Sequence, residues 1–408
     1  MFSKLFVTAM AVAGANAARP FLNEADTGLA DVLGDDYPVG QLPPLEDMVG
    51  LPDFDWAARN YLPATNYTYY RNGVGGESSY RNNLEVFSRY RLRPRTMVDI
   101  SNVGDSLQTT ILGYNFSSPF FISPAARADF AHPDAELNLM KAAGIGGIPY
   151  IVNSPLGEAL EKMHVADTYT QKQVSGYASL PWEDIANVAL DNQTFFTQIY
   201  FQNNVTQNKE LVEQAVKIGA KALVWAVDSP GSPDRQRAAR FDVGSQNTEF
   251  ITNTWEKYDQ FRSWTDLPIV LKGIQTVEDA RAAVDHGVDA IILSNHGARN
   301  LDGSPSSLET ALEIFQQDPK IFEEIEVFAD GGIRYGSDAL RLFALGVKAI
   351  GIGRPIMYSN IYGVDGVSKV ISLLHTSIKN DAANLGLASL KDINSTYVNW
   401  TPQFSWGV

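Results

Sequence analysis

The chain has 408 residues, of which 45% are hydrophobic and 19% charged, enough for two or three average domains or for one large α/β barrel. Its 47 acidic residues outnumber 32 basic ones, which gives a formal net charge of −15. This balance excludes nucleic acid and anionic lipid as main partners, because both require a basic face. The absence of cysteine excludes disulfides, thiol nucleophiles and thiolate metal sites.

The N-terminus reads as a secretory signal peptide over residues 1–17. A short start that ends in Lys4 precedes the apolar run Leu5–Ala13 and then the small-residue sequence Ala15-Asn16-Ala17, which is typical of a cleavage site. The alternative is a buried N-terminal helix. The run is too short to cross a bilayer, so we expect a protein that is secreted or resides in the secretory pathway, with no membrane anchor. N-glycosylation sequences agree with secretion, at Asn66, Asn115, Asn192, Asn204, Asn394 and Asn399.

The chain pattern changes near residue 116. Residues 18–115 predict an N-terminal arm and a helical or extended cap, of which the part up to Pro63 shows no sustained period. Residues 116–395 alternate short apolar runs with helical stretches, and 396–408 form a tail. Eight such runs predict a (β/α)₈ TIM barrel. The runs are 120–122, 148–152, 195–200, 222–227, 268–271, 290–293, 327–329 and 349–352.

Helices are expected between these runs, and several end at a glycine, as helices often do. The expected ranges are 134–143, 209–218, 277–286, 307–316 and 338–345, followed by Gly144, Gly219, Gly287 and Gly346. In such barrels the carboxyl ends of the strands carry the active site. The long connection from Gly231 to Asp266 is therefore interpreted as a lid over that face.

Two glycine-rich strand ends predict a phosphate-bearing ligand. The seventh run is followed by Asp330-Gly331-Gly332-Ile333-Arg334, and the eighth by Gly353-Arg354. Exposed backbone N–H groups at these loops bind anions in this fold, and Arg334 and Arg354 add forked donors. The alternative, that the glycines only make tight turns, leaves both arginines unexplained.

A second group of polar residues predicts acid–base chemistry. His296, at the end of the sixth run and three residues before Arg299, is a natural general base beside an anion clamp. Lys272 ends the preceding run and can face a group that becomes anionic during reaction. Tyr200 and Asp228 end the third and fourth runs, where they supply a hydroxyl and a carboxylate able to orient the histidine. Each alone could be a structural rim residue.

These residues resemble a known family, the FMN-dependent 2-hydroxy acid oxidases and dehydrogenases, which include glycolate oxidase and L-lactate oxidase. The resemblance covers about residues 60–395. It is carried by Ser-Asn-His-Gly-Ala-Arg at 294–299, Leu-Pro-Ile-Val-Leu-Lys-Gly at 267–273 and Asp-Gly-Gly-Ile-Arg-Tyr-Gly-Ser-Asp at 330–338.

The resemblance implies oxidation of an L-2-hydroxy acid to the 2-keto acid, with FMN as cofactor and oxygen as acceptor, giving hydrogen peroxide. It implies a homo-oligomer, commonly a tetramer. Catalysis would use His296, Asp228 and Tyr200, and substrate binding Tyr69, Tyr200, Arg235 and Arg299. Cofactor-binding residues would be Pro124, Ala125, Ala126, Gln198, Lys272, Ser294, Asp330, Gly332, Arg334, Gly353 and Arg354.

The chain departs from the family pattern at several places. Ala226 stands where the family commonly has Thr, Val152-Asn153 where it has a Ser pair, and Asn300 where it has Gln. Alternatives are therefore an FMN-binding barrel with a changed reaction, either alcohol oxidation or monooxygenation, or a binding protein without turnover. Arg299 as a carboxylate clamp weighs against an alcohol, and Ala126 weighs against a monooxygenase.

Overall fold

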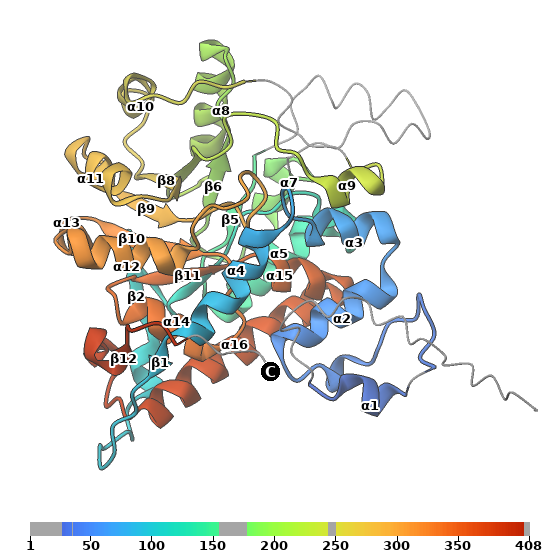
Figure 1. Cartoon of the computed structure of the whole chain (residues 1–408). Coiled ribbons are helices and arrows are strands. Elements are labelled where there is room, and N and C mark those ends of the chain that lie inside the picture. The colour runs from blue at the N-terminus through green and yellow to red at the C-terminus, as the bar shows by residue number, and fades with distance from the viewer. Residues whose placement is uncertain (1–26, 35, 155–177, 244–249, 404–408) are drawn as a thin grey trace, which may run out of the picture.

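The computed structural model describes residues 27–34, 36–154, 178–243 and 250–403, so the predicted signal peptide lies outside the described residues (Figure 1). Its centre is a parallel sheet in the order β4-β11-β10-β9-β8-β7-β6-β5. The strands are β4 (Phe120–Ile122), β5 (Ile151–Val152), β6 (Phe196–Ile199), β7 (Leu223–Ala226), β8 (Ile269–Ile274), β9 (Ala290–Leu293), β10 (Glu326–Asp330) and β11 (Ala349–Ile352).

The sheet closes on itself. A parallel bridge between Ile122 and Tyr150 joins the end of β4 to the residue before β5, so the two outermost strands meet. All eight predicted runs are strands of this barrel, and the predicted (β/α)₈ fold is confirmed. β8 is longer than predicted, because it continues through Lys272 and Gly273, where its register with β9 shifts.

Alternation along the strands builds two cores. Val224 and Val270 point into the barrel, whereas Trp225 and Leu271 pack outward against the helices. This period of two explains why runs of wholly apolar residues form strands buried on both faces. The hairpin of β2 (Thr109–Ile111) and β3 (Tyr114–Phe116) joins the inner core and covers the amino-terminal end of the barrel.

Helices surround the barrel (Figure 1). All five predicted helices occur, but the end at Gly144 is wrong: α5 continues to Gly146, and Gly147 ends it with a φ of 61°. Within the described ranges, no helix is long and apolar enough to cross a membrane. The bounds are α5 (Ala135–Gly146), α7 (Trp182–Asn187), α8 (Val205–Lys217), α11 (Val277–Asp285), α12 (Ser307–Gln317), α13 (Ile321–Glu324), α14 (Gly336–Phe343), α15 (Arg354–Ser359) and α16 (Gly363–Leu385).

The N-terminal segment is more regular than the sequence predicted. It holds α1 (Leu29–Leu33), α2 (Leu51–Tyr61), α3 (Ala64–Arg71) and α4 (Ser78–Glu85). Leu51, Phe54 and Ala58 of α2 recur at helical spacing and are buried, and α2 packs against α15. Proline and glycine on either side of α2 obscured this period in the sequence.

A small sheet joins the N-terminal segment to the C-terminal part of the described chain. β1 (Arg91–Leu92) pairs antiparallel with β12 (Val398–Asn399). The N-terminal segment and the tail are therefore joined to each other, and the boundaries at residues 116 and 396 stay predictions.

The predicted lid contains α9 (Gln236–Arg240) and α10 (Trp255–Arg262), and its residues 244–249 lie outside the described residues. The β5–β6 connection over 153–195 is longer than this one.

Candidate active site

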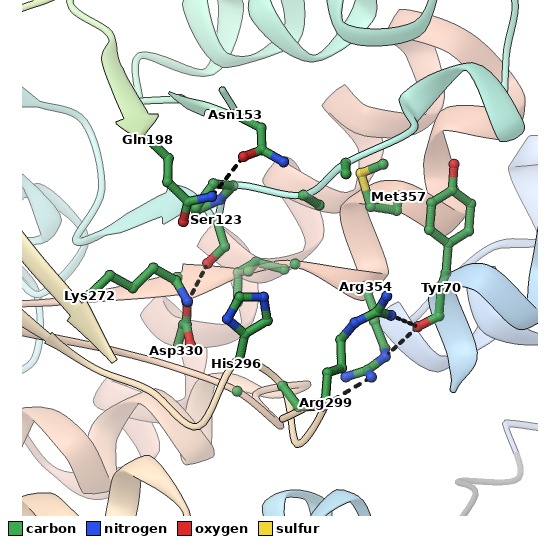
Figure 2. Close-up of a pocket in the computed structure, with 18 of the residues that line it drawn as sticks. Tyr70, Ser123, Asn153, Gln198, Lys272, His296, Arg299, Asp330, Arg354 and Met357 are labelled. Carbon is green, nitrogen blue, oxygen red and sulfur yellow. Dashed lines mark hydrogen bonds and ion pairs between the residues drawn. The ribbon is translucent and has the colours of Figure 1, made fainter. Parts of the chain in front are cut away.

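A pocket opens at the carboxyl ends of the strands, where the sequence predicted the site (Figure 2). Two predicted residues, Asp228 and Ser294, do not line it but contact residues that do. The predicted residues that line it are Tyr69, Pro124, Ala125, Ala126, Gln198, Tyr200, Arg235, Lys272, His296, Arg299, Asp330, Gly332, Arg334, Gly353 and Arg354.

His296 and Asp228 form the central pair of the site. Nδ1 of His296 lies 2.9 Å from Oδ1 of Asp228, whose side chain is 1% exposed. The Tyr200 hydroxyl lies 3.5 Å from Nε2 on the other side of the ring. The Asp228 carboxylate accepts a hydrogen bond from Nδ1–H, so the neutral ring carries its free lone pair on Nε2. His296 is thus arranged as a base.

The surrounding charges keep this pair in its active ionisation state. Burial, supported by the Lys272 and Arg235 charges, lowers the pKa of His296 below its usual value despite the neighbouring Asp228. Burial opposes ionisation of Asp228, but the His296 ring and Lys272 outweigh it and lower the pKa of that carboxyl. At neutral pH the imidazole is neutral and the carboxylate ionised.

This assignment predicts the pH dependence of the reaction. Protonation removes the base, so kcat/KM for flavin reduction is expected to fall only as pH drops through a pKa below the ordinary histidine value of about 6.5. The rate should stay level between that value and neutrality. Stopped-flow reduction across the pH range checks this, and a midpoint above 6.5 would contradict it.

The turn that carries His296 adopts an unfavourable backbone conformation. His296 and Ala298 have φ values of 58° and 60°, in the left-handed region that non-glycine residues avoid. The turn is held because the His296 N–H donates to Ser294 Oγ at 3.0 Å and the Ala298 N–H donates to Asn295 Oδ1 at 3.0 Å. Asn295 exchanges two amide hydrogen bonds of 2.9 Å with Asn83 of α4. Such strain persists only where neighbours fix the conformation.

Lys272 is a buried cation beside the histidine. Its Nζ donates to Ser294 Oγ at 3.0 Å and lies 3.5 Å from Oδ2 of Asp330. The β8 irregularity at Gly273, with a φ of 110°, places it there, and a Cβ on Gly273 would clash with Asp228. Glycine is therefore required where the ends of β7 and β8 approach each other.

Two arginines converge on the pocket opposite the base. Arg299 donates from Nη1 to the Tyr69 carbonyl at 2.7 Å, and Arg235 donates from Nε to the Arg299 carbonyl at 2.8 Å. Burial beside Arg299 lowers the pKa of Arg235 to about 9. Two half-buried guanidinium groups so close together favour a bound anion between them.

Arg354 and Arg334, the two arginines of the predicted phosphate clamp, both line the pocket and donate to backbone carbonyls. The Arg354 guanidinium donates to the carbonyls of Tyr70, Asn72 and Gly297 at 2.8–3.0 Å. It fixes the N-terminal segment on the barrel, and Figure 2 shows it beside Arg299. Nη1 of Arg334 donates to the adjoining Ile333 carbonyl.

One polar atom in the pocket wall lacks a partner. Nε2 of Gln198 donates to Oδ1 of Asn153 at 2.7 Å, which fixes the orientation of the Gln198 amide. Its Oε1 is buried, with no hydrogen-bond partner among the described residues. An acceptor left this way costs stability unless a ligand donates to it.

Comparison with known proteins matches this chain to one family. The model of the FMN-dependent dehydrogenases matches residues 58–174, 163–249 and 243–400. The chain belongs to the FMN-dependent dehydrogenase family. This enzyme family uses FMN as its cofactor.

Curated relatives support the same assignment. A peroxisomal (S)-2-hydroxyacid oxidase of Arabidopsis thaliana is 32% identical over 87% of this chain and 97% of that protein. 2-Hydroxyacid oxidase 2 of Bos taurus is 32% identical over 87% and 99%. The L-lactate dehydrogenase (cytochrome) of Saccharomyces cerevisiae is 29% identical over 86% of this chain but 61% of that protein.

Solved structures share the fold. The flavin-binding domain of baker's yeast flavocytochrome b2 superposes with a TM-score of 0.78 at 30% identity, covering 88% of each chain. A mandelate oxidase in complex with 3,3-difluoro-2-hydroxy-3-phenylpropionic acid gives 0.74 at 32% identity, covering 86% of this chain and 98% of the other.

The residues of this FMN-dependent dehydrogenase fit the cofactor. Gln198 Oε1 is a buried acceptor without a donor among the described residues, and the flavin ring has an N–H group that could donate to it. Lys272 supplies a cation suited to a ring that gains negative charge on reduction. A Cβ on Gly353 would meet only Ser123 within 4 Å, so space remains at the predicted phosphate end near Arg334.

Several lining residues were not among the predicted site residues. Ser123 and Gly331 follow strands directly, a position that could have indicated them, whereas Met357 projects from α15 with no signal in the sequence. Ala226, which stands where the family commonly has Thr, is buried in β7 and does not line the pocket. The full set is Tyr70, Ser123, Asn153, Ser229, Gly297, Gly331, Ile333, Gly351, Ile352 and Met357.

The glycosylation sequences differ in exposure. Asn115, Asn192, Asn204 and Asn394 are exposed, whereas Asn66 and Asn399 are half-buried. Nδ2 of Asn66, the atom that would carry a glycan, donates to the Phe130 carbonyl at 3.0 Å. Use of the sites stays a prediction, and the exposed four are the better candidates.

Proposed function

We propose that this enzyme oxidises an L-2-hydroxy acid to the corresponding 2-keto acid and passes the electrons to oxygen, giving hydrogen peroxide. The observation that carries the proposal is the His296–Asp228 pair, which faces two guanidinium groups across a pocket that fits FMN. A carboxylate and a neighbouring hydroxyl on one small molecule satisfy both sides of this pocket.

The arginines are assigned to substrate binding and the His296–Asp228 pair to proton transfer. Arg299 and Arg235 hold the substrate carboxylate, so the adjoining hydroxyl carbon lies toward His296. FMN supplies the two-electron acceptor when bound. The donor loses two electrons and two protons: Nε2 of His296 accepts one proton, and the electron pair and the other proton would pass to bound FMN. Asp228 then stabilises the imidazolium that forms, because its carboxylate is held 2.9 Å from Nδ1.

Oxygen as acceptor is supported by the pocket and by the relatives. Pro124, Ala125 and Ala126 line the pocket and resemble the oxidase pattern. The plant and bovine relatives named oxidases match over nearly their whole length. Formation of one hydrogen peroxide per turnover in air tests this part.

Secretion and self-association are further parts of the proposal. Leu5–Ala17 has the pattern of a cleaved secretory signal, and the exposed sequons agree with passage through the secretory pathway. Met97, Val98 and Ile100 are exposed apolar side chains in one loop, which a second copy would cover in a homo-oligomer. Glycosidase treatment of protein from the medium, and light scattering, test these parts.

The visible spectrum tests the proposal directly. The protein should purify yellow, and anaerobic addition of one acid from a panel of glycolate, L-lactate, L-mandelate and L-2-hydroxyisocaproate should bleach the flavin. Air should restore the colour. Flavin that stays oxidised with every acid would favour a binding protein without turnover, and bleaching by a free alcohol would favour the changed reaction.

Replacement of Arg299 by lysine is expected to raise KM by about 10-fold to 100-fold. Lysine keeps the charge but cannot offer two parallel donors, and a charged hydrogen bond contributes about 1.5–3 kcal/mol. Steady-state kinetics measure this, with Arg240→Lys, an exposed arginine of α9, as the matched control. An unchanged KM would remove Arg299 from the carboxylate clamp.

A further inference from the structure

Asn300 links the two halves of the active site. Its Nδ2 donates to the backbone carbonyl of Asp228 at 2.8 Å and to Ser229 Oγ at 2.6 Å. Its Oδ1 accepts a hydrogen bond from Nη2 of Arg235 at 3.2 Å. Asn300 itself does not line the pocket, so it acts from behind the wall.

The orientation of the Asn300 amide is fixed by its neighbours. The guanidinium of Arg235 can only donate, and the carbonyl of Asp228 can only accept. Exchanging the nitrogen and oxygen of the amide would place donor against donor and acceptor against acceptor. These three contacts are therefore satisfied in only one orientation of the amide.

Asp228 and Ser229, the two residues of the loop after β7 that bind Asn300, also contact the His296 ring. Asp228 accepts from Nδ1 of His296 at 2.9 Å, and Ser229 Oγ lies 3.3 Å from the same atom. Ser229 is buried, the Asp228 side chain is 1% exposed, and both residues accept a hydrogen bond from the Asn300 amide. Asn300 thus contacts both groups that hold the Nδ1 edge of the ring.

On the other side, Arg235 depends on the same turn. Its Nε donates to the carbonyl of Arg299 and its Nη2 to the side chain of Asn300, so two consecutive residues hold the guanidinium. Arg235 belongs to the predicted lid, which approaches the barrel here. Arg235 therefore contacts the Asn300 side chain directly, with no other residue between them.

We propose that Asn300 is a positioning residue that couples the carboxylate-binding Arg235 to the His296–Asp228 base, so that substrate binding and base alignment occur together. The inference rests on the proposed function, since Arg235 is there assigned to the substrate carboxylate. One side chain then sets both KM and kcat without touching the substrate.

Asn300→Ala is expected to lower kcat by about 10-fold to 100-fold and to raise KM, the range seen when partners of a ligand-holding residue are removed. A residue that only aided folding would lower FMN content and leave the two constants of the remaining enzyme unchanged. Leu301→Ala is the matched control, because Leu301 is the next residue and is 67% exposed. Wild-type constants in Asn300→Ala would overturn the proposal.

A double-mutant cycle separates coupling from two independent effects. Arg235→Lys keeps the charge but loses the planar donor that reaches Asn300. If the two residues are coupled, adding Asn300→Ala to Arg235→Lys should lower kcat/KM by a smaller factor than adding it to the wild type. Effects that multiply in the double variant would overturn the coupling.

Two further measurements keep the test decisive. Asn300→Asp has the same shape but cannot donate to the Asp228 carbonyl, so it should lose kcat/KM even if the alanine variant folds poorly, and wild-type values would overturn the proposal. Binding of pyruvate or benzoylformate, followed by the flavin spectrum, needs no turnover. Weaker binding in Asn300→Ala than in Leu301→Ala supports the inference even if no acid reduces the wild type, and equal binding overturns it.

Discussion

Replacement of His296 by alanine is expected to lower the rate of flavin reduction by about 10³-fold to 10⁴-fold and to leave FMN bound. The base acts in the transition state, where proton transfer to a positioned side chain contributes up to about 10⁴-fold. FMN should be retained because Lys272 and Gln198, the residues that fit its ring, do not hydrogen-bond to the His296 side chain in the described structure. Anaerobic stopped-flow reduction and the flavin-to-protein ratio measure both effects.

The control for this variant is His286→Ala. His286 stacks on Trp255 at the outer side of the barrel and is not part of the pocket. It should reduce flavin at the wild-type rate. Near-normal reduction in His296→Ala would remove His296 from the role of base, whereas loss of FMN would show that the ring is needed for cofactor binding.

The barrel could be predicted from the sequence because each strand is short, apolar and bounded by polar residues. Ala290–Leu293 and Ala349–Ile352 match their predicted ranges, since Ser294 and Gly353 end the two apolar runs in the sequence. The site followed from the same rule, because strand ends in this fold share one face. Fifteen predicted residues that lie far apart in the sequence line one pocket.

What the sequence could not predict depends on contacts across the chain. The three carbonyls that bind the Arg354 guanidinium come from residues 70, 72 and 297, and no local pattern links them. The strained turn at His296 requires Asn83, more than two hundred residues away, to hold Asn295. In the sequence, Asn300 differs from the family pattern, which has Gln at this position, but nothing there indicates its contacts. Its link to Arg235 needed the path of the predicted lid.

Replacement of Lys272 by methionine is expected to have the second large effect, on stability and on FMN binding together. The Lys272 and Asp330 side chains are 5% and 8% exposed, with Nζ and Oδ2 3.5 Å apart. Removing one partner of a buried ion pair leaves the other charge without compensation, which costs about 3–5 kcal/mol. The Ser123 hydroxyl, which donates to Asp330 at 3.3 Å, offsets part of this cost. Urea unfolding of the protein without FMN measures the loss.

FMN makes the effect of Lys272→Met informative about catalysis. If the ammonium also stabilises the negative charge of the reduced ring, FMN should bind more weakly in the variant and its reduction potential should fall, beyond any loss of stability. Lys221→Met, at an exposed lysine before β7, controls for the substitution itself. If the reduction potential of FMN is unchanged and only stability falls, Lys272 pairs with Asp330 but does not stabilise the reduced flavin. Unchanged stability would contradict the expected loss and would show that the folded protein does not depend on the Lys272–Asp330 pair.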